Sequence, residues 1–169
     1  MAIIGFHHTA ISSPDLNRLA GFYQKCFGFE PVFQFAWEPG VEWIDRMMAV
    51  QRTGARVVML RLGNAFLEIF QFSSPEPRAH DPDRRVIDHG FTHICFVVDN
   101  AATECARLEE FGVRLHAPPV ETGLPITGTY GRDPDGNVFE ILEIRDPKHP
   151  LDFGSQRLAA LQARNPISP

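Results

Sequence analysis

The sequence predicts an α+β fold in which two βαβββ modules pair to form a curved mixed sheet around a cleft. Three segments occur twice, and the matched pairs are His8 to Ile11 with His93 to Phe96, Gly63-Asn64 with Gly136-Asn137, and Glu68 to Phe72 with Glu140 to Ile144. One βαβββ module cannot close around its own sheet. The repeat therefore indicates two copies that pack together.

The first copy, residues 1–72, is expected to begin with a strand over residues 3–12. Ser13-Pro14-Asp15 is typical of a helix start, because Ser can cap, Pro is tolerated in the first turn and Asp favours the positive end of the helix dipole. We expect this helix to end near Phe27, at Gly28. The other expected elements are strands over residues 30–38, 56–62 and 65–72, with either a short core-packing helix or a partly apolar loop over residues 39–54.

A linker rich in Pro, Asp and Arg, residues 73–90, should lead to the second copy, residues 91–145. Asp99 is expected to cap its helix, and Gly112 to end it. The expected elements are strands over residues 91–98, 113–116, 126–130 and 138–144 and a helix over residues 101–111. The Pro-rich tail, residues 146–169, contains a modest amphipathic segment over residues 153–163, which we interpret as an appendage or a dimer contact.

Composition excludes several classes of protein. With 169 residues, 44% hydrophobic and 22% charged, the chain is an ordinary globular one. Its formal charge is −5 and its Lys and Arg residues are scattered, so no basic stripe for nucleic acid is present. No apolar run has the length of a membrane span, and the N-terminus lacks a signal sequence, so we expect a cytoplasmic protein without a membrane partner.

Four residues at matched positions of the two copies are candidate metal ligands. The first strand of each copy would present His8 or His93 to the cleft, and the last strand Glu68 or Glu140. Two imidazoles and two carboxylates suit one divalent ion, Zn²⁺, Ni²⁺, Co²⁺, Mn²⁺ or Fe²⁺. His7 should point to the opposite face of its strand and is the alternative ligand if the strand register differs by one residue.

The remaining ionisable residues near these strands have simpler interpretations. Glu143 is expected to face water. His80, His89, His116 and His149 lie in linkers or at edges and are expected to be solvent groups.

The chain resembles the vicinal oxygen chelate superfamily, which includes glyoxalase I, methylmalonyl-CoA epimerase, extradiol dioxygenases and proteins of fosfomycin and bleomycin resistance. The segments that carry the resemblance are His8 to Ile11 with Asp15-Leu16, Phe22-Tyr23 with Phe27 to Phe29, Phe66 to Ile69, His93-Ile94 with Val98 to Asn100, and Asp133 to Glu140. The resemblance implies the glyoxalase/bleomycin resistance/dioxygenase fold, with a metal at His8, Glu68, His93 and Glu140.

Comparison within that superfamily narrows the chemistry. Glu68 resembles the glyoxalase I ligand set. The positions at which glyoxalase I carries an Arg and an Asn for glutathione hold Ser12 and Phe72 here, which indicates a less polar substrate. Tyr130 lies ten residues before Glu140, where extradiol dioxygenases carry an active-site tyrosine.

Three functions are consistent with these residues. The leading hypothesis is a metal-dependent isomerase or lyase for a small carbonyl compound, with Glu140 or Glu68 as the base and Tyr130 as a proton donor to the enediolate. The second is an Fe²⁺ or Mn²⁺ ring-cleaving dioxygenase with His8, His93 and Glu140 as its facial triad. The third is a metal-independent protein that binds an aromatic antibiotic. A homodimer is expected in each case.

Overall fold

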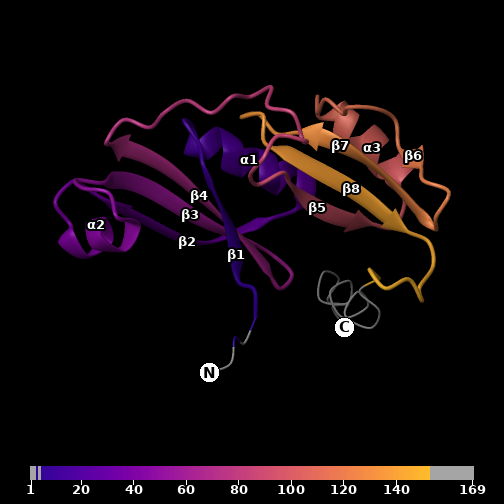
Figure 1. Ribbon diagram of the computed structural model, residues 1–169, viewed down its shortest axis with the longest axis horizontal. Helices are drawn as coiled ribbons and strands as arrows, with labels where there is room; N and C mark the ends of the chain where they lie inside the picture. The colour runs from indigo at the N-terminus through magenta and orange to yellow at the C-terminus, as the bar shows by residue number, and fades with distance from the viewer. Residues whose placement is uncertain (1–2, 4, 153–169) are drawn as a thin grey trace, which may run out of the picture. The chain divides into compact units, whose positions relative to one another are not determined.

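The computed structural model describes residue 3 and residues 5–152, and it divides into two compact units, residues 1–80 and residues 81–169 (Figure 1). We call these units module 1 and module 2 and describe each by itself. The amphipathic segment predicted over residues 153–163 lies outside the described residues.

The described residues of module 1 form one four-stranded mixed sheet and two helices. Its elements are β1 (His8–Ser12), α1 (Leu16–Phe27), β2 (Glu30–Trp37), α2 (Glu42–Met48), β3 (Gly54–Leu62) and β4 (Ala65–Ser74). The strand order is β1-β4-β3-β2, in which β1 runs parallel to β4 and the other neighbours are antiparallel. The short helix α2 is the one that the sequence left open as a helix or a loop.

Module 2 repeats this topology. Its elements are β5 (His93–Val98), α3 (Ala101–Glu110), β6 (Val120–Glu121), β7 (Ile126–Arg132) and β8 (Val138–Ile144). The strand order is β5-β8-β7-β6, again with one parallel pair, β5 with β8, and antiparallel pairs elsewhere. The predicted α+β fold with two βαβββ modules is therefore confirmed.

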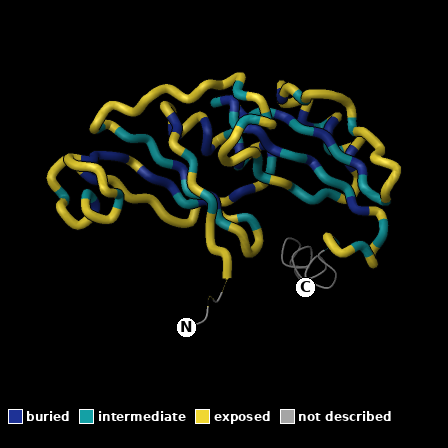
Figure 2. The backbone as a smooth tube through the Cα atoms, viewed as in Figure 1, coloured by how far each residue is buried: buried dark blue, intermediate teal, exposed yellow. Residues whose placement is uncertain are grey.

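Each sheet buries one face against its long helix and leaves the other face more accessible, except where Ile44 of α2 packs with Trp37, Ala55 and Val57 in module 1. In module 1, Leu60 and Ile69 are fully buried together with Leu19 of α1, while in module 2 Phe139 and Ile141 are fully buried. Burial alternates along β7 and along most of β4 (Figure 2), as expected for strands with one covered face. The residues between the buried ones, including Glu68 and Glu140, therefore lie on the open face of each sheet.

The residue that caps each long helix lies one or two positions after the predicted one, although α3 begins at Ala101 as predicted. Asp15 rather than Ser13 caps α1, and Asn100 rather than Asp99 caps α3. The Ser13 N–H donates to the carbonyl of Phe70, which bonds Ser13 to β4, and the Ser13 hydroxyl oxygen accepts from the N–H of Asp15. Tertiary contacts with the sheet thus set the first residue of the helix.

A side chain from the last strand of each module satisfies the first helical N–H. Gln71 Oε1 accepts from the N–H of Leu16 at 3.1 Å, and Glu143 Oε2 accepts from the N–H of Ala101 at 2.8 Å. The prediction that Glu143 faces water is therefore wrong. A carboxylate is favourable at this place because free N–H groups and the helix dipole give the N-terminus a partial positive charge.

Two predicted strands differ from the structure. The first strand starts at His8 and not at residue 3. The strand predicted over residues 113–116 is reduced to a single bridge between Leu115 and Gly131, with a further hydrogen bond from the His116 N–H to the Tyr130 carbonyl. The Pro118-Pro119 pair follows directly, and Pro has no N–H with which to extend the ladder.

The Asp-Pro-Asp-Gly turn joins β7 to β8 and packs against Pro82, near the start of module 2. Asp133 is buried and its carboxylate accepts from the N–H groups of Asp135 and Asn137. Gly136 has φ +87°, and a Cβ there would lie 2.4 Å from the backbone of Pro82, so only glycine fits. Among the described residues, no helix is long and apolar enough to cross a membrane.

Candidate metal centre

Module 1 brings His8 and Glu68 into contact on the open face of its sheet. His8 lies on β1 and Glu68 on β4, and the His8 Nε2 atom is 3.3 Å from the Glu68 Oε2 atom. Both side chains keep part of their surface exposed, 38% for His8 and 20% for Glu68. The pair is therefore accessible to an ion or a ligand.

His7 does not lie on the face opposite His8, as the alternation of a strand would require, because β1 begins only at His8. The Nδ1 atoms of His7 and His8 are 2.8 Å apart. The His7 ring stacks on Phe66 with 4.6 Å between ring centroids. The contact with Glu68 comes from His8, and His7 packs beside it.

Module 2 contains the matching pair. The His93 Nε2 atom on β5 is 3.0 Å from the Glu140 Oε2 atom on β8. The His93 Nδ1 atom lies 2.9 Å from the hydroxyl oxygen of Thr92. A histidine that ligates a metal usually forms a hydrogen bond through its other ring nitrogen.

The distances within both pairs suit adjacent ligands of one divalent ion. Metal–N and metal–O bonds of about 2.0–2.2 Å place neighbouring donor atoms about 3.0–3.4 Å apart, depending on the coordination geometry. The observed separations are 3.3 and 3.0 Å. Within the parts of the chain that the structure describes, no group of three or more His, Cys, Asp or Glu side chains forms a potential metal site. Each module therefore supplies two donors, and a single ion held by all four stays a prediction.

Glu140 has two polar neighbours in addition to His93. Tyr130 lies directly opposite Glu140 on β7, and its ring centroid is 5.1 Å from that of His93. Cys95 lies beside Glu140 on β5. Loss of hydration, followed by the Glu140 carboxylate, raises the pKa of the Cys95 thiol to about 12. Cys95 is therefore a protonated neighbour of this carboxylate. Its position, two residues after His93 on a strand, was the sequence signal that could have identified it.

Desolvation and the nearby Glu140 carboxylate also raise the pKa of the Tyr130 phenol. Tyr130 consequently keeps its proton at neutral pH. A neutral phenol beside a carboxylate and an imidazole can donate a hydrogen bond or a proton to a bound oxygen.

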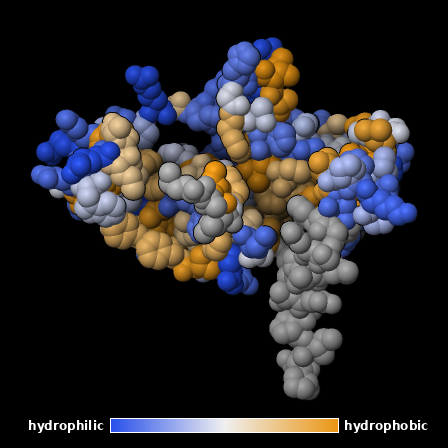
Figure 3. All heavy atoms as spheres, turned by 60° about the horizontal axis from the view of Figure 1, so that its bottom comes forward, coloured by the Kyte–Doolittle hydropathy of each residue, from blue (hydrophilic) through white to orange (hydrophobic). Residues whose placement is uncertain are grey.

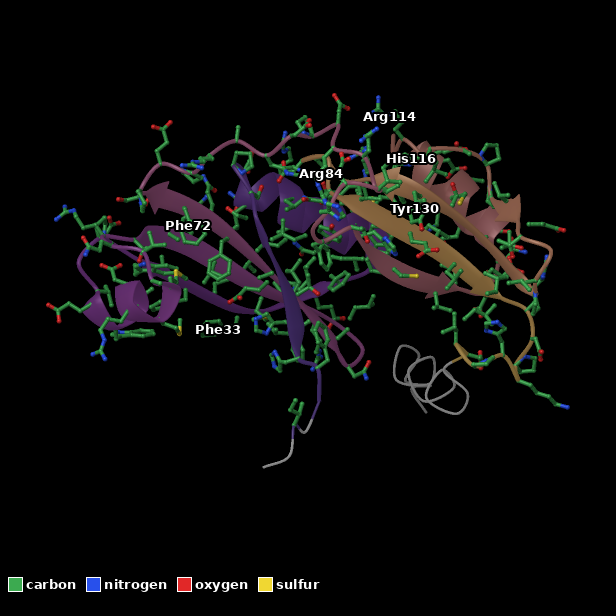
Figure 4. The ribbon with its side chains drawn as sticks, viewed as in Figure 1. Phe33, Phe72, Arg84, Arg114, His116 and Tyr130 are labelled. Atoms are coloured by element: carbon green, nitrogen blue, oxygen red, sulfur yellow. The ribbon has the colours of Figure 1, made fainter. Side chains whose placement is uncertain are left out.

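The open face of module 1 is strongly apolar beside the His8–Glu68 pair. Phe33 and Phe35 on β2 are 59% and 42% exposed, and Phe72 on β4 stacks on Phe70 with ring centroids 5.3 Å apart. Figure 3 shows apolar side chains at the surface on the side that carries α2 and β2, and Figure 4 labels Phe33 and Phe72. Phe72 stands at the position where the resemblance to glyoxalase I implies an Asn that binds glutathione. Its side chain has no polar atom and cannot make that hydrogen bond.

The sequence matches a family described as "Glyoxalase/Bleomycin resistance protein/Dioxygenase superfamily" over residues 5–141. A curated 2-epi-5-epi-valiolone epimerase from Actinomyces sp is 32% identical over 149 residues, which cover 83% of this chain and 80% of that protein. The lactoylglutathione lyase of Schizosaccharomyces pombe is 28% identical over 93% of this chain, and the chain spans 53% of its length.

The fold is shared with solved structures. The crystal structure of the glyoxalase family protein APC24694 from Bacillus cereus superimposes with a TM-score of 0.75. The match covers 85% of this chain and 95% of that one at 19% sequence identity. At this level of identity the similarity concerns the arrangement of strands and helices.

Proposed function

Because this chain belongs to the Glyoxalase/Bleomycin resistance protein/Dioxygenase superfamily, we propose that it is a divalent-metal-dependent isomerase or lyase that acts on a small carbonyl compound with two adjacent oxygens. The observation that carries the proposal is the repeated His–Glu contact, at 3.3 Å in module 1 and 3.0 Å in module 2. The curated relatives include an epimerase and a lyase, which is the same pair of reaction classes.

His8, Glu68, His93 and Glu140 would hold the metal ion. The mixed nitrogen and oxygen donors suit Zn²⁺, Ni²⁺, Co²⁺, Mn²⁺ or Fe²⁺. When bound, such an ion would polarise the carbonyl of the substrate and stabilise the negative charge left after a neighbouring proton is removed. The protein side chains would bind the substrate and move that proton.

Glu140 is the stronger candidate for the base that removes the proton from carbon. Tyr130 and Cys95 both lie next to it and both carry protons at neutral pH. The residue opposite Glu68 is Met59, and the residue beside Glu68 on β1 is Ala10. Proton transfer needs groups that can accept and return a proton, and among the described strand neighbours of the two carboxylates such groups lie beside Glu140.

Tyr130 would donate its proton to the substrate oxygen while Glu140 accepts one from carbon. The raised pKa of Tyr130 keeps the phenol in the donor form. The exposed Phe33 and Phe35 would contact the less polar part of the substrate. Removal of apolar surface from water would favour binding there.

Single alanine variants of the two histidines test the metal site. His8→Ala and His93→Ala should each lower the divalent metal content of protein purified without chelator, and should lower turnover on a panel of α-ketoaldehyde, acyl-CoA and catechol substrates. His80→Ala is the matched control, because His80 is exposed in the segment before module 2. Metal content equal to that of the wild type in both His8→Ala and His93→Ala would end the proposal.

A second function is supported by the contact between Tyr130 and His93. A ring-cleaving dioxygenase would use His8, His93 and Glu140 as a facial triad with Fe²⁺ or Mn²⁺. Oxygen consumption with catechols after anaerobic loading with iron would favour this function. Proton exchange at carbon without oxygen uptake would favour the isomerase or lyase.

A further inference from the structure

At one matched position, module 1 has an Arg–Glu pair and module 2 has two arginines. In module 1, Arg61 on β3 lies opposite Glu30 on β2, and the two side chains form an ion pair at 3.8 Å. In module 2 the equivalent of Arg61 is Arg132, because each lies opposite the residue two positions before the candidate ligand Glu. The Arg132 N–H donates to the carbonyl of Arg114. An arginine thus stands where module 1 has Glu30.

The hydrogen-bond partners of the Arg132 guanidinium are uncharged backbone carbonyls. It donates to the carbonyl oxygens of Pro82, Arg84 and Gly136. In the described part of the chain, neither Arg114 nor Arg132 forms an ion pair with a carboxylate. Like charges at facing positions of neighbouring strands repel each other. This local excess of positive charge occurs in a chain whose net charge is −5.

His116 connects these arginines to the candidate active site. Its ring centroid is 6.3 Å from that of Tyr130, which in turn is 5.1 Å from that of His93. Figure 4 shows Arg114, His116 and Tyr130 close together on module 2. Burial and then the positive charges of Arg132 and Arg114 lower the pKa of His116. The three rings therefore form a row that leads from a candidate metal ligand to uncompensated cations.

We propose that Arg114, His116 and Arg132, the cationic cluster, bind an oxyanion group, a carboxylate or a phosphate, that the substrate carries at the end remote from its reacting oxygens. This inference rests on the proposed function and adds a substrate class to it, an anionic carbonyl compound. Arg114 has a free planar guanidinium that suits either oxyanion in a two-point contact.

The geometry explains why an anion would stabilise module 2. An oxyanion between Arg114 and Arg132 would offset the repulsion between two like charges, at the place where module 1 has the Arg61–Glu30 ion pair. A neutral His116 can donate a further hydrogen bond from one ring nitrogen. Arg132 lies two residues after Tyr130 on β7, and the His116 ring lies beside the Tyr130 ring. The remainder of the substrate would therefore extend past Tyr130 toward His93 and Glu140.

Titration of the full-length protein with inorganic phosphate and, separately, with malonate tests the cluster. The readout is the NMR signal of the His116 ring and of the arginine side-chain N–H groups. Both anions are simple probes that lack the reacting carbonyl. We expect saturable shifts at His116, and the tighter of the two anions will identify the substrate group as a phosphate or a carboxylate.

Arg114→Glu is the decisive variant, because it gives module 2 the ion pair that module 1 has. Loss of one charge-assisted contact should weaken anion binding by about tenfold or more. Arg46→Glu on the exposed surface of α2 changes the net charge equally and should leave binding at His116 unchanged. Equal weakening in the two variants, or no shift at His116 with either anion, would overturn the inference.

Metal analysis separates this inference from the proposed function. Arg114→Glu should keep the wild-type metal content, since it contacts none of the candidate ligands. If anions fail to shift His116 while His8→Ala and His93→Ala still lose metal, the anion site is wrong and the metal-dependent function stands. If those two variants keep their metal, the proposed function fails whatever the anions do.

Discussion

Modules 1 and 2 share a topology and a His–Glu pair but differ in almost every side chain around that pair. Next to Glu68 lie Ala10 and Met59, whereas next to Glu140 lie Cys95 and Tyr130. Module 1 thus surrounds its carboxylate with apolar groups, and module 2 surrounds its carboxylate with groups that carry protons. The two copies therefore share the candidate metal donors and differ in the side chains beside them.

The difference extends to the outer strands. Module 1 has an exposed aromatic surface, with Phe33 and Phe35 on β2, and an Arg61–Glu30 ion pair. Module 2 has Arg114 and Arg132 at the corresponding place. Equivalent changes in the two modules should therefore have different effects.

The two carboxylates should differ most in catalysis. At saturating metal concentration, Glu140→Gln should lower turnover by about 10²–10⁴-fold, because it removes the general base. Glu68→Gln should weaken metal binding but recover much of its turnover when metal is added. Turnover and metal content are measured on the same preparations. Equal and irreversible losses in the two variants would show that the modules do not divide the work as stated.

Tyr130→Phe should lower kcat by about 10–100-fold with the metal content unchanged, since one proton donor is lost. Met59→Leu, at the matched position of module 1, should have no measurable effect on kcat. The raised pKa of Tyr130 means that the wild-type phenol keeps its proton until the pH exceeds the usual tyrosine value of about 10. A Tyr130→Phe enzyme with wild-type kcat would remove Tyr130 from the mechanism.

Replacing a glycine by alanine should change the free energy of unfolding in opposite directions at Gly131 of module 2 and Gly21 of module 1. A Cβ at Gly131 would lie 2.4 Å from the ring of Phe139, which is fully buried. Gly131→Ala should therefore reduce the free energy of unfolding by about 1–3 kcal/mol. Gly21→Ala in α1 meets nothing within 4 Å and should raise it by about 0.4–1 kcal/mol. Urea unfolding followed by circular dichroism measures both changes, and a neutral Gly131→Ala would contradict the packing of β7 on β8.

The smallest effect concerns the helix starts. Glu143→Gln would give α3 the same neutral acceptor that α1 receives from Gln71. We expect a loss of about 0.3–1 kcal/mol in the free energy of unfolding, because a negative charge near a helix N-terminus is removed. The loss should shrink in high salt, which screens this interaction. A loss that is independent of salt would show that the charge of Glu143 does not act on the helix.

The repeat in the sequence identified the candidate site residues. The matched positions of His8 with His93 and of Glu68 with Glu140 predicted that the four side chains converge, and the structure brings them together as two separate His–Glu pairs, at 3.3 and 3.0 Å. Their use as ligands of one ion is still a prediction. Strand alternation was reliable for Glu68 and Glu140, because a register error of one residue would bury the wrong set of side chains. It failed for His7, which precedes the first residue of β1.

Other features depend on partners that are distant in sequence. Ser13 and Asp99 are good capping residues by type, yet Asp15 and Asn100 cap the helices. The first helical N–H groups are bonded to Gln71 and Glu143, which lie 55 and 42 residues away. Local preferences could not include these contacts.

The sequence by itself determined that two similar βαβββ units would form and which side chains would share the open face of each sheet, because hydrophobic alternation and turn residues act over a few neighbours. The tertiary structure decided where each helix begins, and it set Arg114 against Arg132 instead of against a carboxylate. Those outcomes follow from which strands lie side by side, and the free energy of such contacts depends on residues that only folding brings together.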